Sequence, residues 1–84
     1  MIDDRIIELI TSSDYKDRMK GEYLELKGRY ERLEAMVIKY RADALDFIPS
    51  CSLEILENQL EVMGDYLRIL EERAAIEDVD LEGD

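Results

Sequence analysis

Between residues 19 and 44, apolar side chains recur at alternating intervals of four and three residues. They are Met19, Tyr23, Leu26, Tyr30, Leu33, Val37, Tyr40 and Ala44. Because an α-helix turns once in about 3.6 residues, this spacing places all of them along one side of a helix. The pattern predicts a long helix over residues 14–45 whose apolar seam faces a partner helix.

A second seam follows after a short interruption. Its members are Leu53, Leu56, Leu60, Met63, Leu67, Leu70 and Ala74, and they predict a second helix over residues 53–78. The intervening residues 46–52 hold Pro49, the one proline of the chain, and end at Ser52, a residue type that caps helix N-termini. The two seams together predict an all-α fold, an antiparallel, coiled-coil-like helical hairpin.

The two ends of the chain complete a single domain of residues 1–84. Apolar residues near the N-terminus predict a short helix over residues 1–12, which is too short to be stable alone and must dock on the hairpin or on a neighbouring subunit. Residues 79–84 are acidic and contain a glycine, so we expect a frayed tail there.

The second helix carries more apolar surface than one partner helix needs. Beside its seam lie Ile55, Val62, Tyr66, Ile69 and Ile76, and the combined apolar arc of roughly 160° exceeds the roughly 100° of an ordinary amphipathic helix. The extra arc predicts that either the N-terminal helix or a second subunit covers it. With one cysteine and no histidine, neither an intrachain disulfide nor a typical zinc site can stabilise so small a chain. We therefore expect a homo-oligomer, a dimer or larger.

Charge is unevenly distributed. Residues 1–48 hold nine basic and eleven acidic side chains, a net charge of −2, whereas residues 49–84 hold two basic and eleven acidic ones, a net charge of −9. This balance disfavours direct binding to duplex nucleic acid. The longest apolar run is four residues, far short of a membrane span, so we expect a cytoplasmic protein without a membrane partner.

The residue types that support catalysis are scarce. The chain has no histidine to act as a general base, and its glycines do not form a phosphate-binding loop. We therefore expect no catalytic residues, no metal site, no cofactor and no enzymatic activity.

Aromatic and basic residues on the first long helix are the candidate ligand site. Tyrosine rings stack on nucleobases and Lys or Arg binds phosphate, and the chain offers both types in one segment. The residues are Arg18, Lys20, Tyr23, Lys27 and Tyr30. The alternative interpretation is an ordinary core edge with exposed ion pairs between residues four apart.

Small residues recur every seven positions on the same helix, at Gly21, Gly28, Ala35 and Ala42. Glycine inside a helix costs about 1 kcal/mol relative to alanine, so this stripe suggests that another helix or a ligand approaches the backbone closely. The alternative is that these small residues are tolerated variation on an exposed helix surface, with no role in contacts.

The second helix offers a candidate partner-binding surface. Glu57, Glu61 and Asp65 are like charges spaced four residues apart, which is mildly destabilising, and Ile69 follows on the extra apolar arc. Such a surface suits a basic protein partner, although solvation alone also accounts for an acidic ridge.

The chain resembles, over roughly residues 14–81, small proteins encoded by phages and prophages of Firmicutes that are grouped with a crAss-like phage protein. The loop and second helix carry most of the resemblance, in Lys39-Tyr40, Leu45-Asp46-Phe47-Ile48-Pro49-Ser50-Cys51, Leu56, Gln59, Met63, Tyr66-Leu67, Ile69-Leu70-Glu71, Arg73-Ala74 and Ile76-Glu77. The first long helix adds Tyr15-Lys16-Asp17-Arg18-Met19, Glu22-Tyr23 and Leu26-Lys27.

This resemblance implies a phage-encoded protein of the host cytoplasm that counters host defence. By analogy, it implies an oligomeric binder that sequesters a nucleotide second messenger of host immunity. The alternative is an acidic, anti-CRISPR-like inhibitor that binds a basic surface of a host defence protein.

Overall fold

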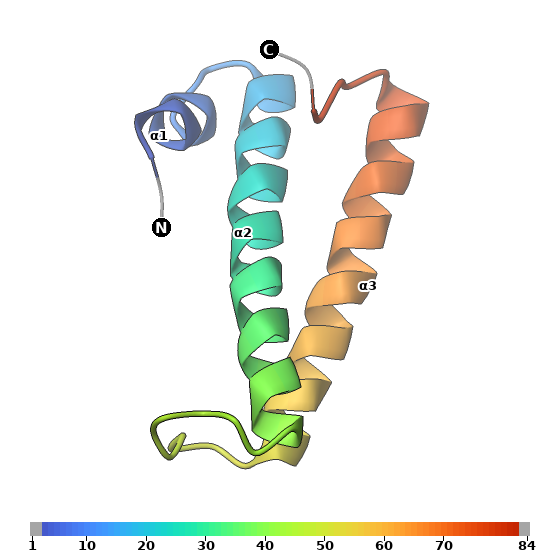
Figure 1. Cartoon of the computed structure of the whole chain (residues 1–84). Coiled ribbons are helices and arrows are strands. Elements are labelled where there is room, and N and C mark those ends of the chain that lie inside the picture. The colour runs from blue at the N-terminus through green and yellow to red at the C-terminus, as the bar shows by residue number, and fades with distance from the viewer. Residues whose placement is uncertain (1–2, 83–84) are drawn as a thin grey trace.

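The protein is a helical hairpin with a short helix docked on its side (Figure 1). The computed structural model describes residues 3–82 and places helices at α1 (Asp4–Ile10), α2 (Tyr15–Arg41) and α3 (Leu53–Glu77). Helices α2 and α3 run antiparallel, and no strand occurs among these residues. The predicted all-α hairpin is confirmed. Residues 1–2 and 83–84, which the predicted first helix and tail include, lie outside the described residues.

Capping side chains begin the two long helices, Asp14 for α2 and the predicted Ser52 for α3. The Asp14 carboxylate accepts a hydrogen bond from the backbone N–H of Lys16 at 2.9 Å, and the Ser52 hydroxyl accepts one from the N–H of Ile55 at 3.3 Å. Each bond satisfies a backbone donor that the first helical turn leaves unpaired. Helix α1 begins later than predicted because the Asp3 carboxylate caps it by accepting from the N–H of Ile6 at 2.9 Å.

Helix α2 ends at Arg41 and not at residue 45, which corrects the predicted boundary. Asp43 adopts the left-handed region with φ of 55°, and the N–H of Ala44 turns back to the carbonyl of Lys39 at 2.8 Å. This is the Schellman arrangement, which satisfies the last helical carbonyls and redirects the chain. Ala44 therefore belongs to the loop, which spans residues 42–52.

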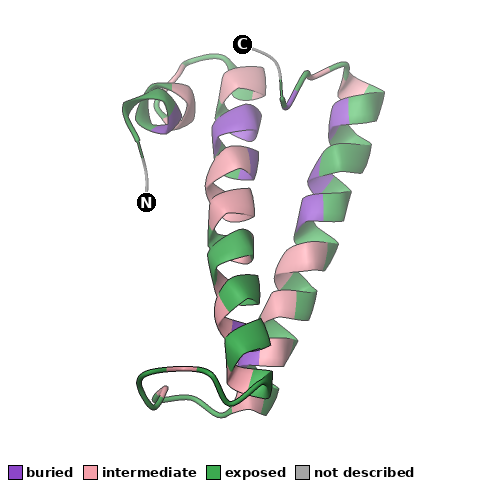
Figure 2. Cartoon of the chain, in the orientation of Figure 1, coloured by how far each residue is buried: buried purple, intermediate pink, exposed green. Residues whose placement is uncertain are grey.

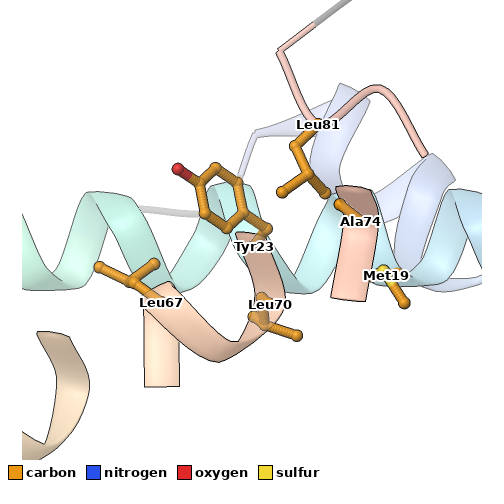
Figure 3. Packing of buried hydrophobic residues seen from close by; sticks show 6 residues of the cluster. All are labelled: Met19, Tyr23, Leu67, Leu70, Ala74 and Leu81. Carbon is orange, nitrogen blue, oxygen red and sulfur yellow. The ribbon is translucent and has the colours of Figure 1, made fainter. Parts of the chain in front are cut away.

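The densest packing lies at the end of the hairpin that carries α1. The cluster there is formed by Met19, Tyr23, Leu67, Leu70, Ala74 and Leu81 (Figure 3). On α3, the buried positions lie on the side toward α2, and exposed positions cover its outer side (Figure 2). Near the loop, Val37 is fully buried and Leu56 is 9% exposed, so the seams that the sequence predicts do form the helix contact.

The C-terminal segment packs against the hairpin, whereas the sequence predicted a frayed tail. Asp78 takes the left-handed conformation with φ of 59°, which ends α3 and turns the chain back toward α2 (Figure 1). Leu81 is then only 7% exposed and lies in the core cluster. The acidic composition of residues 79–82 obscured this anchor, in which Leu81 and the half-buried Val79 both pack on the core cluster.

Helix α1 docks on α2, as a helix of its length requires. Gly21 allows the approach, since a Cβ atom there would lie 2.7 Å from Ile10 Cγ2 and 2.8 Å from Leu9 Cβ. The close approach predicted for the glycine stripe is confirmed at this position. Within residues 3–82, α1 contacts α2 and not α3, so it does not cover the extra apolar arc of α3.

Candidate functional site

Lys27 and Tyr23 lie together on the side of the hairpin that the C-terminal segment covers. The Lys27 ammonium lies 5.8 Å from the centroid of the Tyr23 ring, within the range of a cation–π contact. Two carboxylates hold the pair: the Tyr23 hydroxyl donates to Glu71 at 2.7 Å, and Lys27 Nζ donates to Glu82 at 2.8 Å. One aromatic ring, one cation and two acids from three segments therefore converge.

Burial and these partners fix the protonation states of the cluster. Burial, together with the hydrogen bond to Glu71, raises the pKa of Tyr23, so its phenol is neutral at pH 7. The hydrogen bond to Glu82 raises the pKa of Lys27, so its ammonium keeps the charge. The cluster contains a cation whose main partner, Glu82, belongs to a short terminal segment.

The other predicted ligand residues, Arg18, Lys20 and Tyr30, have surroundings different from those of Tyr23 and Lys27. The Tyr30 ring packs on the backbone of α3, because its Cε2 atom lies 3.3 Å from where a Cβ of Gly64 would be. Lys20 is 9% exposed and lines a hollow beside α1, whereas the Arg18 guanidinium donates to the carbonyl of Ser12 at 2.9 Å. The structure thus joins Tyr23 with Lys27, whereas the side chain of Arg18, in the first turn of α2, reaches back to the segment before the helix.

Sequence reasoning missed both acids of the cluster. Glu71 follows Leu70 of the seam directly, so its proximity to α2 was readable from the heptad pattern. Glu82 offered no such signal, because its position depends on the left-handed turn at Asp78.

The predicted partner-binding residues lie along α3 and differ in their surroundings. Glu57 bonds to Arg41 at 2.7 Å and so ties α3 to the end of α2. Asp65 makes a loose ion pair with Arg68 at 3.8 Å, and Glu61 makes none with the described residues. Ile69 is 45% exposed.

The side of the hairpin away from the C-terminal segment carries a shallow groove. A hollow of about 560 Å³ is lined by Leu26, Arg29, Arg32, Leu33, Gln59 and Met63. A neighbouring hollow shares Leu26 and Arg29 and reaches Tyr66, whose hydroxyl donates to Glu22. That bond raises the pKa of Tyr66.

Two kinds of site are absent from residues 3–82. No cluster of three or more acidic or cysteine side chains in this range has the arrangement of a metal site. None of the three helices combines the length and the apolar character that crossing a membrane requires.

Comparison with known proteins gives one match. The family model described as Sequestin matches residues 13–76. This range begins just before α2 and includes α2, the loop and nearly all of α3. No curated protein and no solved structure matches the chain.

Proposed function

The chain belongs to the Sequestin family, and from this premise we propose that it sequesters a signalling nucleotide of host immunity without converting it. The family name describes a sequestering protein, which is a binding role and not a catalytic one. In this proposal the protein is phage-encoded and acts in the infected bacterial host.

The observation that carries the proposal is the ion pair between Lys27 and Glu82 beside the Tyr23 ring. A phosphate group has the same charge and similar acceptor oxygens as the Glu82 carboxylate, so it is chemically suited to replace it on the Lys27 ammonium. Exposed ion pairs contribute only up to about 1 kcal/mol, so breaking the ion pair itself would cost little. The rings of Tyr23 and Tyr30 would stack on the base of the nucleotide after residues 79–82 move away.

The proposed mechanism is binding alone. With no histidine in the sequence, the usual general base for hydrolysis is missing. The residues Lys27 and Tyr23 would hold and orient the ligand, and the C-terminal segment would yield its place to the phosphate. Retention of an intact nucleotide is enough to lower its free concentration and so to silence a receptor.

A thermal-shift panel tests the proposal. Cyclic dinucleotides, cyclic trinucleotides and ADP-ribose derivatives are added separately to the purified protein. A ligand at a hundred times its Kd stabilises the fold by about 2.7 kcal/mol, which raises the Tm of a small domain by several degrees. Lys27→Ala should abolish the shift, and Lys39→Ala, an exposed lysine of the same helix, should keep it. No shift with any member of the panel would contradict the proposal.

A second function is favoured by one observation, the exposed Glu61 on α3, which has no ion pair within residues 3–82. Together with Asp65 it offers negative charge to a basic groove of a host defence protein, and the sequestered ligand would then be that protein. Capture of a basic nuclease, lost on Glu61→Lys but not on Lys27→Ala, would favour this candidate over the first.

A further inference from the structure

A hollow of about 450 Å³ lies between α2 and the loop that follows it, at the end of the hairpin away from α1 (Figure 1). Its α2 side consists of Arg32, Ala35, Met36 and Lys39. The distance along a helix from Lys27 to Lys39 is about 18 Å, so the hollow is separate from the cluster of Lys27 and Tyr23. Its volume is within the range of pockets that hold small molecules.

Two positive charges border this hollow. The side chains of Arg32 and Lys39 are exposed and make no hydrogen bond or ion pair within residues 3–82. A helical side chain covers the turn on the N-terminal side of its own Cα, so Lys39 extends over Ala35 toward Arg32. The chain as a whole has a net charge of −11, and these two cations make the hollow a local exception that suits an anion.

Apolar side chains form most of the remaining wall. Met36 and Leu45 are half-buried, and the Phe47 ring is 53% exposed, so it offers a free surface to a ligand. The α2 side extends from Arg32 to Lys39, two helical turns or about 10 Å, which suits an extended chain better than a single ring. Asp46 of the loop also lines the hollow, and its negative charge disfavours a second anionic group on the ligand.

We propose that this hollow binds a carboxylate with one flexible apolar chain, such as a free fatty acid. The carboxylate accepts hydrogen bonds from the Lys39 ammonium and the Arg32 guanidinium, which are charge-assisted and therefore strong. The chain lies along Met36 and against Phe47, where its contact removes apolar surface from water. The ligand differs in class from a nucleotide, so this inference does not depend on the function proposed for the Lys27 site.

Isothermal titration calorimetry of the full chain with hexanoate, octanoate and decanoate, each below its micelle concentration, tests the inference. One carboxylate should bind per chain, and its dissociation constant should fall about fourfold with each added CH₂ group until the hollow is filled. Decanol has the chain without the charge and should bind at least about tenfold more weakly than decanoate. Equal affinity for decanol and decanoate, or affinity that does not change with chain length, would overturn the inference.

Variants that remove one charge locate the site. Lys39→Met and Arg32→Met keep an apolar stem and should each weaken decanoate binding about tenfold. Arg68→Met is the matched control, because it removes the same charge from an exposed arginine of α3 that does not line the hollow, and it should bind as the wild type does. Circular dichroism verifies that each variant keeps its helices. Equal binding by all three variants would place decanoate elsewhere on the protein and overturn the inference.

Vesicles distinguish a free carboxylate from a membrane lipid, which combines an anionic group with apolar chains in the same way. When phosphatidylglycerol vesicles are sedimented, the protein should remain in the supernatant, because its net charge of −11 opposes an anionic surface. Sedimentation of the protein together with the vesicles would overturn the assignment to a free ligand.

Discussion

Lys27 of α2 and Glu82 beyond the end of α3 form an ion pair of 2.8 Å, although 55 residues separate them in the chain. Leu81, the residue before Glu82, places the carboxylate there because its side chain is buried in the core cluster. The hydrophobic contact thus positions a charge that the proposed ligand must displace. Stability and binding are coupled through this one segment.

Removing the anchor should therefore destabilise the fold. Leu81→Ala should lower the free energy of unfolding by about 2 kcal/mol, at the lower end of leucine truncations because the segment can relax. Ile48→Ala removes an isoleucine that is 94% exposed, and it should change the free energy of unfolding by less than about 0.5 kcal/mol. Urea unfolding at one fixed protein concentration measures both. Equal effects of the two variants would show that the segment does not pack as described.

Weakening the ion pair without touching the anchor should strengthen binding. Glu82→Gln removes the competing carboxylate and should tighten binding of the nucleotide found in the thermal-shift panel about three- to tenfold. Glu61→Gln removes the same charge from α3 away from Lys27 and serves as the control for net charge. Isothermal titration calorimetry gives both dissociation constants. If the two variants bind alike, Glu82 does not compete with the ligand.

The glycines at positions 21 and 28 should respond oppositely to alanine. At Gly21 an added Cβ would lie 3.0 Å from the backbone nitrogen of Ile10, so Gly21→Ala should push α1 away and lower stability by about 1–2 kcal/mol. At Gly28 the nearest atom is Nη1 of Arg32 at 3.2 Å, the end of a flexible side chain. Gly28→Ala should therefore raise stability by up to about 1 kcal/mol through helix propensity. Thermal unfolding compares them, and a stabilising Gly21→Ala would contradict the docking of α1.

The sequence predicted the hairpin because its helices depend on residues that are close together in the chain. The two seams, the cap at Ser52 and the close approach at Gly21 each follow from residue type and helical spacing. The end of α2 was misplaced because a left-handed aspartate, Asp43, ends the helix before its apolar pattern does. The packed C-terminal segment was missed because it depends on a second such turn, at Asp78.

The candidate site was only partly predictable for the same reason. Tyr23 and Lys27 are one helical turn apart, so their proximity is a property of α2 alone. Glu82 reaches them through tertiary packing. Arg18 was grouped with them by residue type, but it lies in the first turn of α2 and its guanidinium bonds to Ser12 in the preceding segment.

Alkaline pH should destabilise the protein through Tyr23. Its pKa is raised above the ordinary value of 10.0 by burial and by Glu71, so the unfolded state loses the phenolic proton first. The stabilisation is fully present below pH 10 and decreases above it, by about 1.4 kcal/mol per pH unit until the folded-state pKa is reached. Urea unfolding between pH 9.5 and 11 measures this slope. Tyr23→Phe should reduce the slope of the unfolding free energy against pH by an amount on the order of 1.4 kcal/mol per pH unit. An unchanged slope would mean that the hydroxyl is not held as described.

Recovery of the bound ligand tests sequestration most directly. The protein is mixed in excess with the nucleotide from the panel, the solution is passed through a filter that retains the protein, and the retained fraction is denatured. Wild-type protein should remove the nucleotide from the filtrate and release it chemically unchanged on denaturation, and Lys27→Ala should leave it in the filtrate. A nucleotide that passes the filter with wild-type protein, or that is recovered as a product, would contradict sequestration.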